Sequence, residues 1–354
     1  MRSFEYASPE TEAEALELLA EHGGNTAVLA GGTDLMTLLK RDVIQPARVV
    51  DIKNIPSLRG IKRHDNGVLI GANTTLDELN EHALAADYRS LTDVVEGIRS
   101  IQITANGTLA GDLCQLPHCW YYRNGHGLLA LQDGESLVAT GDNRYHAILG
   151  NSGPAKFVSA SRFAPSAIAW DAKVRIVTRR PANVEHVSNV LSSSEKKTEH
   201  VENVLHEEWL PLEYFFITPK TNSQGVTVLK PGQLITHLWL PAAKETRSAT
   251  YEVLQLEGLD QPQVSAAACV GLEGGIVRTA KIVLGHVAPT PWIAHEASRW
   301  LVGQKLTTDT AETAGQMAVA KATPLSQNDY KVQQAQTAVK RALLKATNQL
   351  GKVL

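Results

Sequence analysis

The 354-residue sequence has little of what marks several common classes of protein. Its three cysteines are too few for a disulfide framework, so we expect a protein of the reducing cytoplasm. No apolar run approaches the roughly 20 residues that span a bilayer, which argues against a membrane partner. The net charge of −3 provides no basic field for nucleic acid. The opening "MRSFEYASPE" lacks the pattern of a secretory signal.

Several catalytic and metal-binding motifs are also missing. No serine lies in a G-x-S-x-G elbow, so hydrolase chemistry has no anchor. The twelve histidines include no H-E-x-x-H, and the cysteines form no paired C-x-x-C, so we expect no metal-ligating residues. Neither a Walker A motif nor the G-x-G-x-x-G dinucleotide fingerprint is present. A ligand site must therefore be sought in less specific patterns.

The first fifty residues predict a small α/β unit. Ser8 can cap a helix that starts at Pro9 and ends near Gly23. A strand over 26–30 then leads, through a glycine pair, into a helix that ends near Arg41. A second strand follows at 47–52, and strand, helix and strand at this spacing form one α/β unit.

The rest of the chain predicts alternating strands and helices with one segment that resists assignment. Residues 179–208 are polar, and "SSSEKK" within them reads as an exposed loop. The composition changes near Pro241, which is the best candidate for a domain boundary. Strands are expected at 67–72, 232–241, 264–272 and 277–285, and helices at 76–85, around 91–98 and in two or three segments of 294–348.

The turn "LAGGTDL" raises the first question about a ligand. Gly31 and Gly32 would let an anion approach the backbone, Thr33 adds a hydroxyl, and Asp34 can cap the next helix. Backbone N–H groups in such a turn form a concave set of donors that suits a phosphate. The same residues also make a good strand-to-helix turn with no ligand, and alone this plainer interpretation is favoured.

A second turn changes the balance. "NGTLAGDL", at 106–113, again places glycines and a threonine together. Two such turns, distant in sequence, could hold a diphosphate from two sides.

These segments carry a resemblance to a known family. "LAGGTDLMTLLK", "GTLAGDL" and "VSAAACVGL…VLGHVAPTPWIAHEA" resemble the FAD-binding medium subunit of the molybdenum hydroxylases, the family of xanthine dehydrogenase and carbon monoxide dehydrogenase, over residues 2–350. The resemblance implies an α+β fold. A two-part FAD-binding domain of the vanillyl-alcohol-oxidase (PCMH) type would cover 1–242, with an extended loop at 114–160. A C-terminal α/β domain like that of the CO dehydrogenase flavoprotein would cover 245–354.

The resemblance also implies a cofactor site for FAD and no catalytic side chain. Thr33 stands where some sugar and alcohol oxidases carry the histidine that binds FAD covalently, so we expect non-covalent FAD. The chain departs from the family where Asp112 replaces an asparagine, Ala110 replaces a glycine and Arg162 replaces an aspartate. Gln261 stands where relatives often carry Lys or Trp near the flavin ring. The expected FAD-binding residues are Leu29, Ala30, Gly31, Gly32, Thr33, Asp34 and Leu35 in the first turn and Thr108, Gly111 and Asp112 in the second.

The loop at 114–160 resembles the insertion of the 4-hydroxybenzoyl-CoA reductase and aldehyde oxidoreductase branch. There the insertion holds a 4Fe–4S cluster on four cysteines. Only Cys114 and Cys119 are available here, and two thiolates do not complete such a site. Histidines could supply the missing ligands of a cluster, and the candidates are His118, His126 and His146. The simpler interpretation is an extended loop with two buried thiols and no cluster.

The implied function is that of an oxidoreductase subunit in a heterotrimer. Electrons from a large molybdopterin subunit would pass through the 2Fe–2S clusters of a small subunit to this chain's FAD. They would then reach NAD⁺, oxygen or another acceptor. The departures at Asp112, Arg162 and Gln261 keep a second hypothesis open, a flavin-free subunit that keeps only the fold and the subunit contacts. A stand-alone flavin oxidase is disfavoured, because no substrate domain or covalent histidine of that class is recognised.

Overall fold

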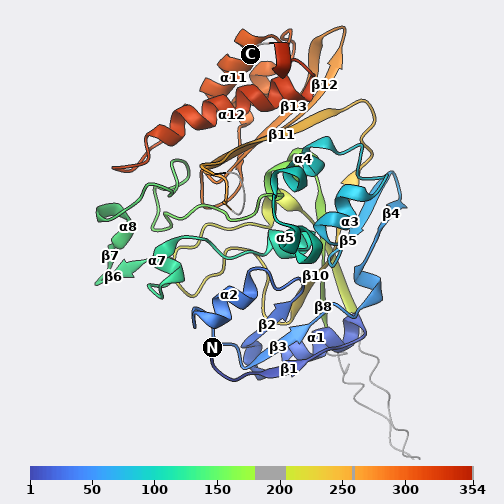
Figure 1. Ribbon diagram of the computed structural model, residues 1–354, viewed down its shortest axis with the longest axis vertical. Helices are drawn as coiled ribbons and strands as arrows, with labels where there is room; N and C mark the ends of the chain where they lie inside the picture. The colour runs from blue at the N-terminus through green and yellow to red at the C-terminus, as the bar shows by residue number, and fades with distance from the viewer. Residues whose placement is uncertain (180–204, 257–259, 353–354) are drawn as a thin grey trace, which may run out of the picture.

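The computed structural model describes residues 1–179, 205–256 and 260–352. Figure 1 shows an N-terminal part at the bottom and centre of the view and a C-terminal part at the top. Within the described residues, no helix is both long enough and apolar enough to cross a membrane.

The first sheet is small and parallel, as the strand, helix and strand pattern predicts. Its central strand, β3, pairs with β1 on one side and β2 on the other. The helix α2 follows β2 after the glycine turn, so the turn lies at the carboxyl end of a strand. The elements are β1 (Glu5–Ala7), α1 (Glu12–Ala20), β2 (Thr26–Leu29), α2 (Leu35–Lys40) and β3 (Arg48–Asp51).

The start of α1 differs from the prediction. The Thr11 hydroxyl, not that of Ser8, accepts the hydrogen bond from the backbone N–H of Glu14, at 3.2 Å. Ser8 is instead an acceptor for the Asn54 amide, at 3.1 Å. The helix ends before Gly23 as expected, and Gly23 has a φ of +61° in a short 3₁₀ turn.

The second sheet has five antiparallel strands in the order β4-β5-β10-β8-β9. β10 is its central strand and pairs with β5 on one side and with β8 on the other. Helices on one face bury the main apolar core against this sheet. The strands are β4 (Ile61–His64), β5 (Gly67–Gly71), β8 (Lys173–Arg179), β9 (Leu205–Pro211) and β10 (Gln233–Pro241); the helices are α3 (Leu76–Glu81), α4 (Arg89–Gly97), α5 (Ile101–Asn106), α6 (Leu109–Leu113) and α9 (Ala164–Ala169).

Two of the predicted elements in this region can be compared with the structure. Thr75 caps α3 in a capping box with Glu78, and the helix ends at Glu81, earlier than the predicted 85. The turn at 106–113 is not a plain loop, since Thr108 starts the short helix α6. The segment "SSSEKK" lies outside the described residues.

The insertion forms a separate lobe on the left of Figure 1. It has its own small core, made by Leu128, Leu129, Ala155 and Phe157. Its elements are α7 (Trp120–Arg123), β6 (Leu131–Gln132), β7 (Glu135–Ser136) and α8 (Leu137–Thr140).

The C-terminal part is a four-stranded antiparallel sheet in the order β11-β12-β13-β14. Both faces of β12 are covered. Ala266 and Ala268 face the core formed with the C-terminal helices, whereas Ala267 and Cys269 join the core of the N-terminal part. This explains the small residues of the strand and confirms Cys269 as core. The elements are β11 (Arg247–Val253), β12 (Val264–Glu273), β13 (Ile276–Gly285), β14 (Trp292–Ile293), α10 (His295–Leu301), α11 (Thr308–Ala318) and α12 (Tyr330–Ala346).

Candidate cofactor site

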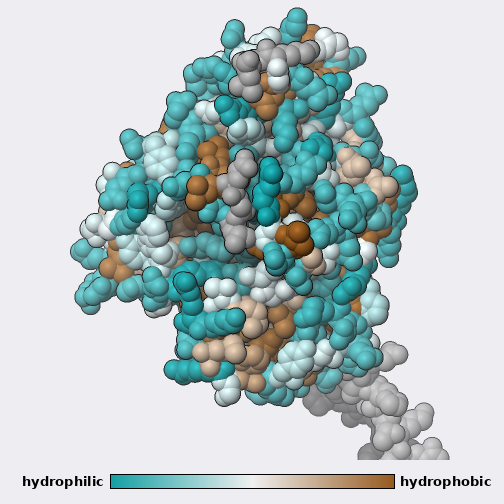
Figure 2. Space-filling model, viewed as in Figure 1, coloured by the Kyte–Doolittle hydropathy of each residue, from teal (hydrophilic) through white to brown (hydrophobic). Residues whose placement is uncertain are grey.

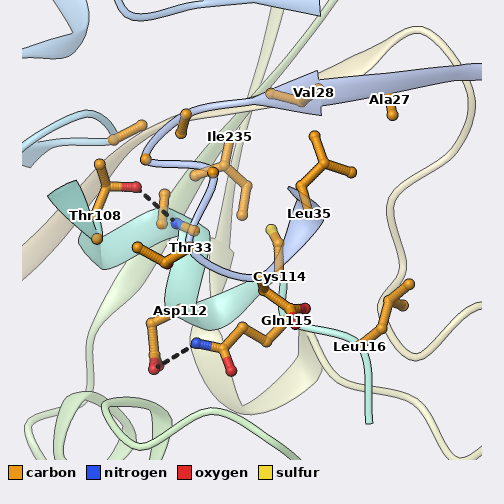
Figure 3. Close-up of a pocket in the computed structure, with 18 of the residues that line it drawn as sticks. Ala27, Val28, Thr33, Leu35, Thr108, Asp112, Cys114, Gln115, Leu116 and Ile235 are labelled. Carbon is orange, nitrogen blue, oxygen red and sulfur yellow. Dashed lines mark hydrogen bonds between the residues drawn. The ribbon is translucent and has the colours of Figure 1, made fainter. Parts of the chain in front are cut away.

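A cavity of about 560 Å³ lies between the first glycine turn and α6. Figure 2 shows this face hollowed between the two parts of the molecule, with apolar side chains in the hollow. Nine of the ten predicted residues line the cavity, and Leu29, at the end of β2, does not. The nine are Ala30, Gly31, Gly32, Thr33, Asp34, Leu35, Thr108, Gly111 and Asp112, and Figure 3 shows how Thr33, Leu35, Thr108 and Asp112 lie in it.

The two turns touch each other directly. A Cβ atom on Gly31 would lie 1.8 Å from the Asn106 carbonyl oxygen and 3.0 Å from the Gly107 Cα atom. No side chain fits there, so glycine is required by backbone packing. Gly32 is required for another reason, its φ of +71°.

The first turn leaves a run of backbone donors unused. The N–H groups of Gly31, Gly32, Thr33 and Asp34 find no protein acceptor among the described residues. The Thr33 hydroxyl is likewise unused within this part of the chain, and Thr33 is exposed. Consecutive free N–H groups around a concave turn are what binds a phosphate.

The second turn uses most of its donors internally. The Thr108 hydroxyl accepts from the N–H of Gly111 at 3.1 Å, and the Thr108 carbonyl accepts from the N–H of Asp112 at 2.9 Å. The N–H of Leu109 donates to Thr74, at 3.2 Å. Within the described residues, only the N–H groups of Thr108 and Ala110 are left for a ligand in this turn.

Asp34 does not cap α2, contrary to the prediction. Its carboxylate instead accepts two hydrogen bonds from Arg123, at 2.7 and 3.2 Å. Arg123 is buried and also donates to the carbonyls of Leu116 and Pro117, both at 2.8 Å. A buried guanidinium needs an anionic partner, and this need outweighs a cap. The sequence offered no signal for Arg123, which lies inside "HCWYYR".

Asp112 is held by a turn that precedes α9. Its carboxylate accepts from the Ser161 hydroxyl, from the N–H of Arg162 at 3.2 Å and from the N–H of Phe163 at 3.1 Å. Burial raises the pKa of Asp112 to about 6, and these hydrogen bonds limit the rise. Figure 3 shows the carboxylate also accepting from Gln115, away from Thr108. This aspartate therefore serves the fold.

Arg162 has its own buried partner. Its Nε donates to Glu252 at 3.0 Å, its Nη2 contacts the same carboxylate, and both side chains are buried. A Cβ atom on Gly97 would lie 2.6 Å from Glu252, so the pair also explains that glycine. Glu252 is a second residue that the sequence did not indicate. Arg162 and Gln261 both line the cavity.

The two cysteines of the insertion lie in different places. Cys114 lines the 560 Å³ cavity, whereas Cys119 lies with its Sγ 3.1 Å from His146 Nε2 at a neighbouring cavity. Across residues 1–179, 205–256 and 260–352, no three His, Cys, Asp or Glu side chains form a group that could hold a metal ion.

Family comparisons identify the chain. Residues 2–243 match the family described as "FAD binding domain in molybdopterin dehydrogenase", and residues 249–346 match the "CO dehydrogenase flavoprotein C-terminal domain". The chain belongs to the FAD-binding subunits of the molybdenum hydroxylases. This confirms the predicted family, fold class, cofactor and oxidoreductase role, and it favours the FAD-binding hypothesis over the flavin-free one.

Relatives of this flavoprotein subunit align along its whole length. The carbon monoxide dehydrogenase medium chain of Hydrogenophaga pseudoflava is 24% identical, over 96% of each chain. The aldehyde oxidoreductase FAD-binding subunit PaoB of Escherichia coli K12 is 26% identical, over 99% of this chain and 100% of PaoB. Quinoline 2-oxidoreductase from Pseudomonas putida 86 has the same fold, with a TM-score of 0.70, 19% identity and 99% coverage of both chains.

Proposed function

We propose that the two turns hold the pyrophosphate of FAD between them. The observation that carries the proposal is the run of four unused N–H groups from Gly31 to Asp34, on a turn that lines the cavity. Thr33 would add a hydroxyl donor, and Thr108, Gly111 and Asp112 would form the opposite wall. Ala30 and Leu35 would flank the cradle, and Leu29 would support it from outside the cavity.

The charges around the cradle support this assignment. An ionised carboxylate next to a diphosphate would repel it, yet both acidic residues of the turns are engaged elsewhere. Arg123 neutralises Asp34, and donors from 161–163 bind the Asp112 carboxylate. The backbone donors are then the dominant field at the turn.

The residues of this chain would position the flavin, which supplies the redox chemistry when bound. No cavity residue is assigned as an acid or a base. We infer a hetero-oligomer with a large molybdopterin subunit and a small 2Fe–2S subunit, since two of the relatives are named medium chains. NAD⁺, oxygen or another acceptor would take the electrons. Three unpaired cysteines support a cytoplasmic setting for the complex.

A titration with parts of the cofactor tests the proposed cradle. Calorimetry on the chain stripped of flavin should show binding of FAD and of ADP, because both carry the diphosphate. Riboflavin, which has the ring but no phosphate, should bind at least a hundredfold more weakly than FAD. Equal affinities for FAD and riboflavin would show that the two turns do not bind the diphosphate. Copurification of tagged chain with both other subunits tests the hetero-oligomer.

A further inference from the structure

Arg162 gives the 560 Å³ cavity a permanent side-chain cation. Of the described residues that line this cavity, no other is a lysine or an arginine. The two acidic residues of the lining, Asp34 and Asp112, already accept hydrogen bonds from other parts of the protein. The proposed pyrophosphate cradle consists of backbone N–H groups and makes no use of Arg162, so the function of this cation is open.

The guanidinium of Arg162 has one nitrogen that the described part of the protein does not use. Nε and Nη2 both contact the Glu252 carboxylate, Nε at 3.0 Å. Nη1 has no acceptor within residues 1–179, 205–256 and 260–352, and it is not among the atoms of these residues that are both unpartnered and enclosed by protein. Because Nη1 carries two N–H groups, Arg162 has donors to offer to a ligand.

Glu252 lies behind Arg162 with respect to the cavity. Arg162 lines the cavity, whereas Glu252 does not. Glu252 lies against the end of α4 instead, since a Cβ atom on Gly97 would be 2.6 Å from its Oε2 and 3.1 Å from Arg162 Nη2. The cavity therefore faces the positive end of this ion pair.

The backbone of Arg162 is fixed to the second glycine turn. Its N–H donates to the Asp112 carboxylate at 3.2 Å, and the N–H of Phe163 donates to the same carboxylate at 3.1 Å. Arg162 is thus held at both ends, by Asp112 at the backbone and by Glu252 at the guanidinium. A donor that is already held in place loses little freedom when a ligand binds, which favours affinity.

A buried ion pair at this place needs a reason other than stability. The side chains of Arg162 and Glu252 are only 6% and 7% exposed. Removing two charges from water is costly, and apolar residues of similar volume are often at least as stabilising. A cation kept at a ligand cavity supplies such a reason when the ligand carries negative charge.

We infer that Arg162 binds a negatively charged group of the ligand in this cavity through Nη1. The inference rests on the proposed FAD site. FAD has two groups of this chemistry: the diphosphate, which is always charged, and the flavin ring, which gains negative charge when it is reduced. A charge-assisted hydrogen bond from a guanidinium suits either group.

The test removes both charges of the pair together, so that neither is left buried and alone. The double variant Arg162→Gln, Glu252→Gln keeps two polar side chains in their place. Calorimetry on the flavin-free chain measures its affinity for ADP. A redox titration of the FAD-loaded chain measures how tightly it binds reduced relative to oxidised FAD. The matched control is Arg175→Gln, Glu12→Gln, an ion pair of 3.2 Å that does not line the cavity.

We expect one of these two quantities to fall about tenfold in the Arg162 double variant, and neither to change in the control. A lower ADP affinity assigns Nη1 to the diphosphate, because ADP has no flavin ring. Unchanged ADP affinity with about tenfold weaker relative binding of reduced FAD, a fall of about 30 mV in the two-electron potential, assigns Nη1 to the ring.

Unchanged values of both quantities would overturn the inference. Arg162→Lys gives the same comparison if the double variant fails to fold, because it keeps a cation beside Glu252 but lacks the planar fork of donors. It should lower the same quantity, and full retention of both would again overturn the inference. Failure of the proposed FAD site has a different signature, since the unaltered protein would then bind neither FAD nor ADP.

Discussion

The two glycine turns, which touch each other and both line the 560 Å³ cavity, are built differently. The first, from Leu29 to Leu35, leaves four consecutive N–H groups unused. In the second turn, at 106–113, most N–H groups form hydrogen bonds within the protein, several of them at the start of α6. Two N–H groups of the described turn have no acceptor. In the proposed site the first turn would therefore be the anion cradle, and the second would be the wall that holds it in shape through the contact of Gly31 with Asn106.

The two turns also manage their acidic residues differently. Asp34 forms an ion pair with Arg123, which balances its negative charge. Asp112 has only neutral donors from its hydrogen-bonded neighbours, so its burial cost appears as a raised pKa. In the proposed site, the negative charge of the two turns would be offset by an ion pair in the first turn and by neutral hydrogen-bond donors in the second.

The largest effect is expected from Gly31→Ala. The new Cβ atom would overlap the Asn106 carbonyl oxygen, so the first turn must move away from the second. We expect FAD affinity to fall at least a hundredfold, measured by titration, together with a lower melting temperature. Gly153→Ala is the matched control, because nothing lies within 4 Å of its added Cβ and its φ is not positive. An alanine variant that keeps full FAD affinity would mean that the contact between the turns is dispensable.

Local patterns predicted most of the fold but not the partners of the site. The strand β12 follows from its apolar run and was predicted to within one residue, whereas α1 was predicted as a helix but begins three residues later than expected, with Thr11 and not Ser8 as its cap. The two glycine turns were found the same way. Arg123 and Glu252 were missed because their roles depend on contacts between distant segments, with Asp34 and Arg162. No periodicity or spacing in one sequence records such pairs.

The second effect in size concerns the ion pair of the first turn. Asp34→Asn leaves the buried Arg123 guanidinium without an anionic partner, and we expect a loss of about 3 kcal/mol in the free energy of unfolding. Asp142→Asn breaks an exposed pair with Arg144 on the same insertion and should change the free energy of unfolding far less, because solvent screens this pair. Denaturant unfolding measures both. Equal losses in the two variants would contradict the assigned role of Arg123.

Asp112, in the second turn, should make the stability of the protein depend on pH. The folded protein binds a proton at Asp112 with a pKa of about 6, whereas the ordinary value is 3.8. As pH falls from about 6 to 3.8 the folded state therefore takes up the proton first, and this group adds stability, by at most about 1.4 kcal/mol per pH unit.

Asp112→Asn cannot gain from this protonation. Its stability relative to the wild-type protein should fall as the pH is lowered from 7 to 4.5, because all other titrating groups are common to both. Urea unfolding at the two pH values measures the difference. A difference that does not change with pH would show that Asp112 is an ordinary, ionised carboxylate.

The smallest effects are expected from replacing Thr33 or Thr108, one in each turn, by valine. Thr108→Val removes the cap that accepts from the N–H of Gly111, and we expect a loss of about 1 kcal/mol in the free energy of unfolding. Thr33→Val removes a hydroxyl that bonds to nothing in the described part of the chain, so stability should change by less than about 0.5 kcal/mol. FAD affinity should respond to Thr33→Val, by about five- to tenfold, since the hydroxyl is then a ligand contact only. Unfolding and FAD titration of both variants would therefore give opposite rankings, and matching rankings would mean that the first turn, like the second, exists chiefly to hold the fold.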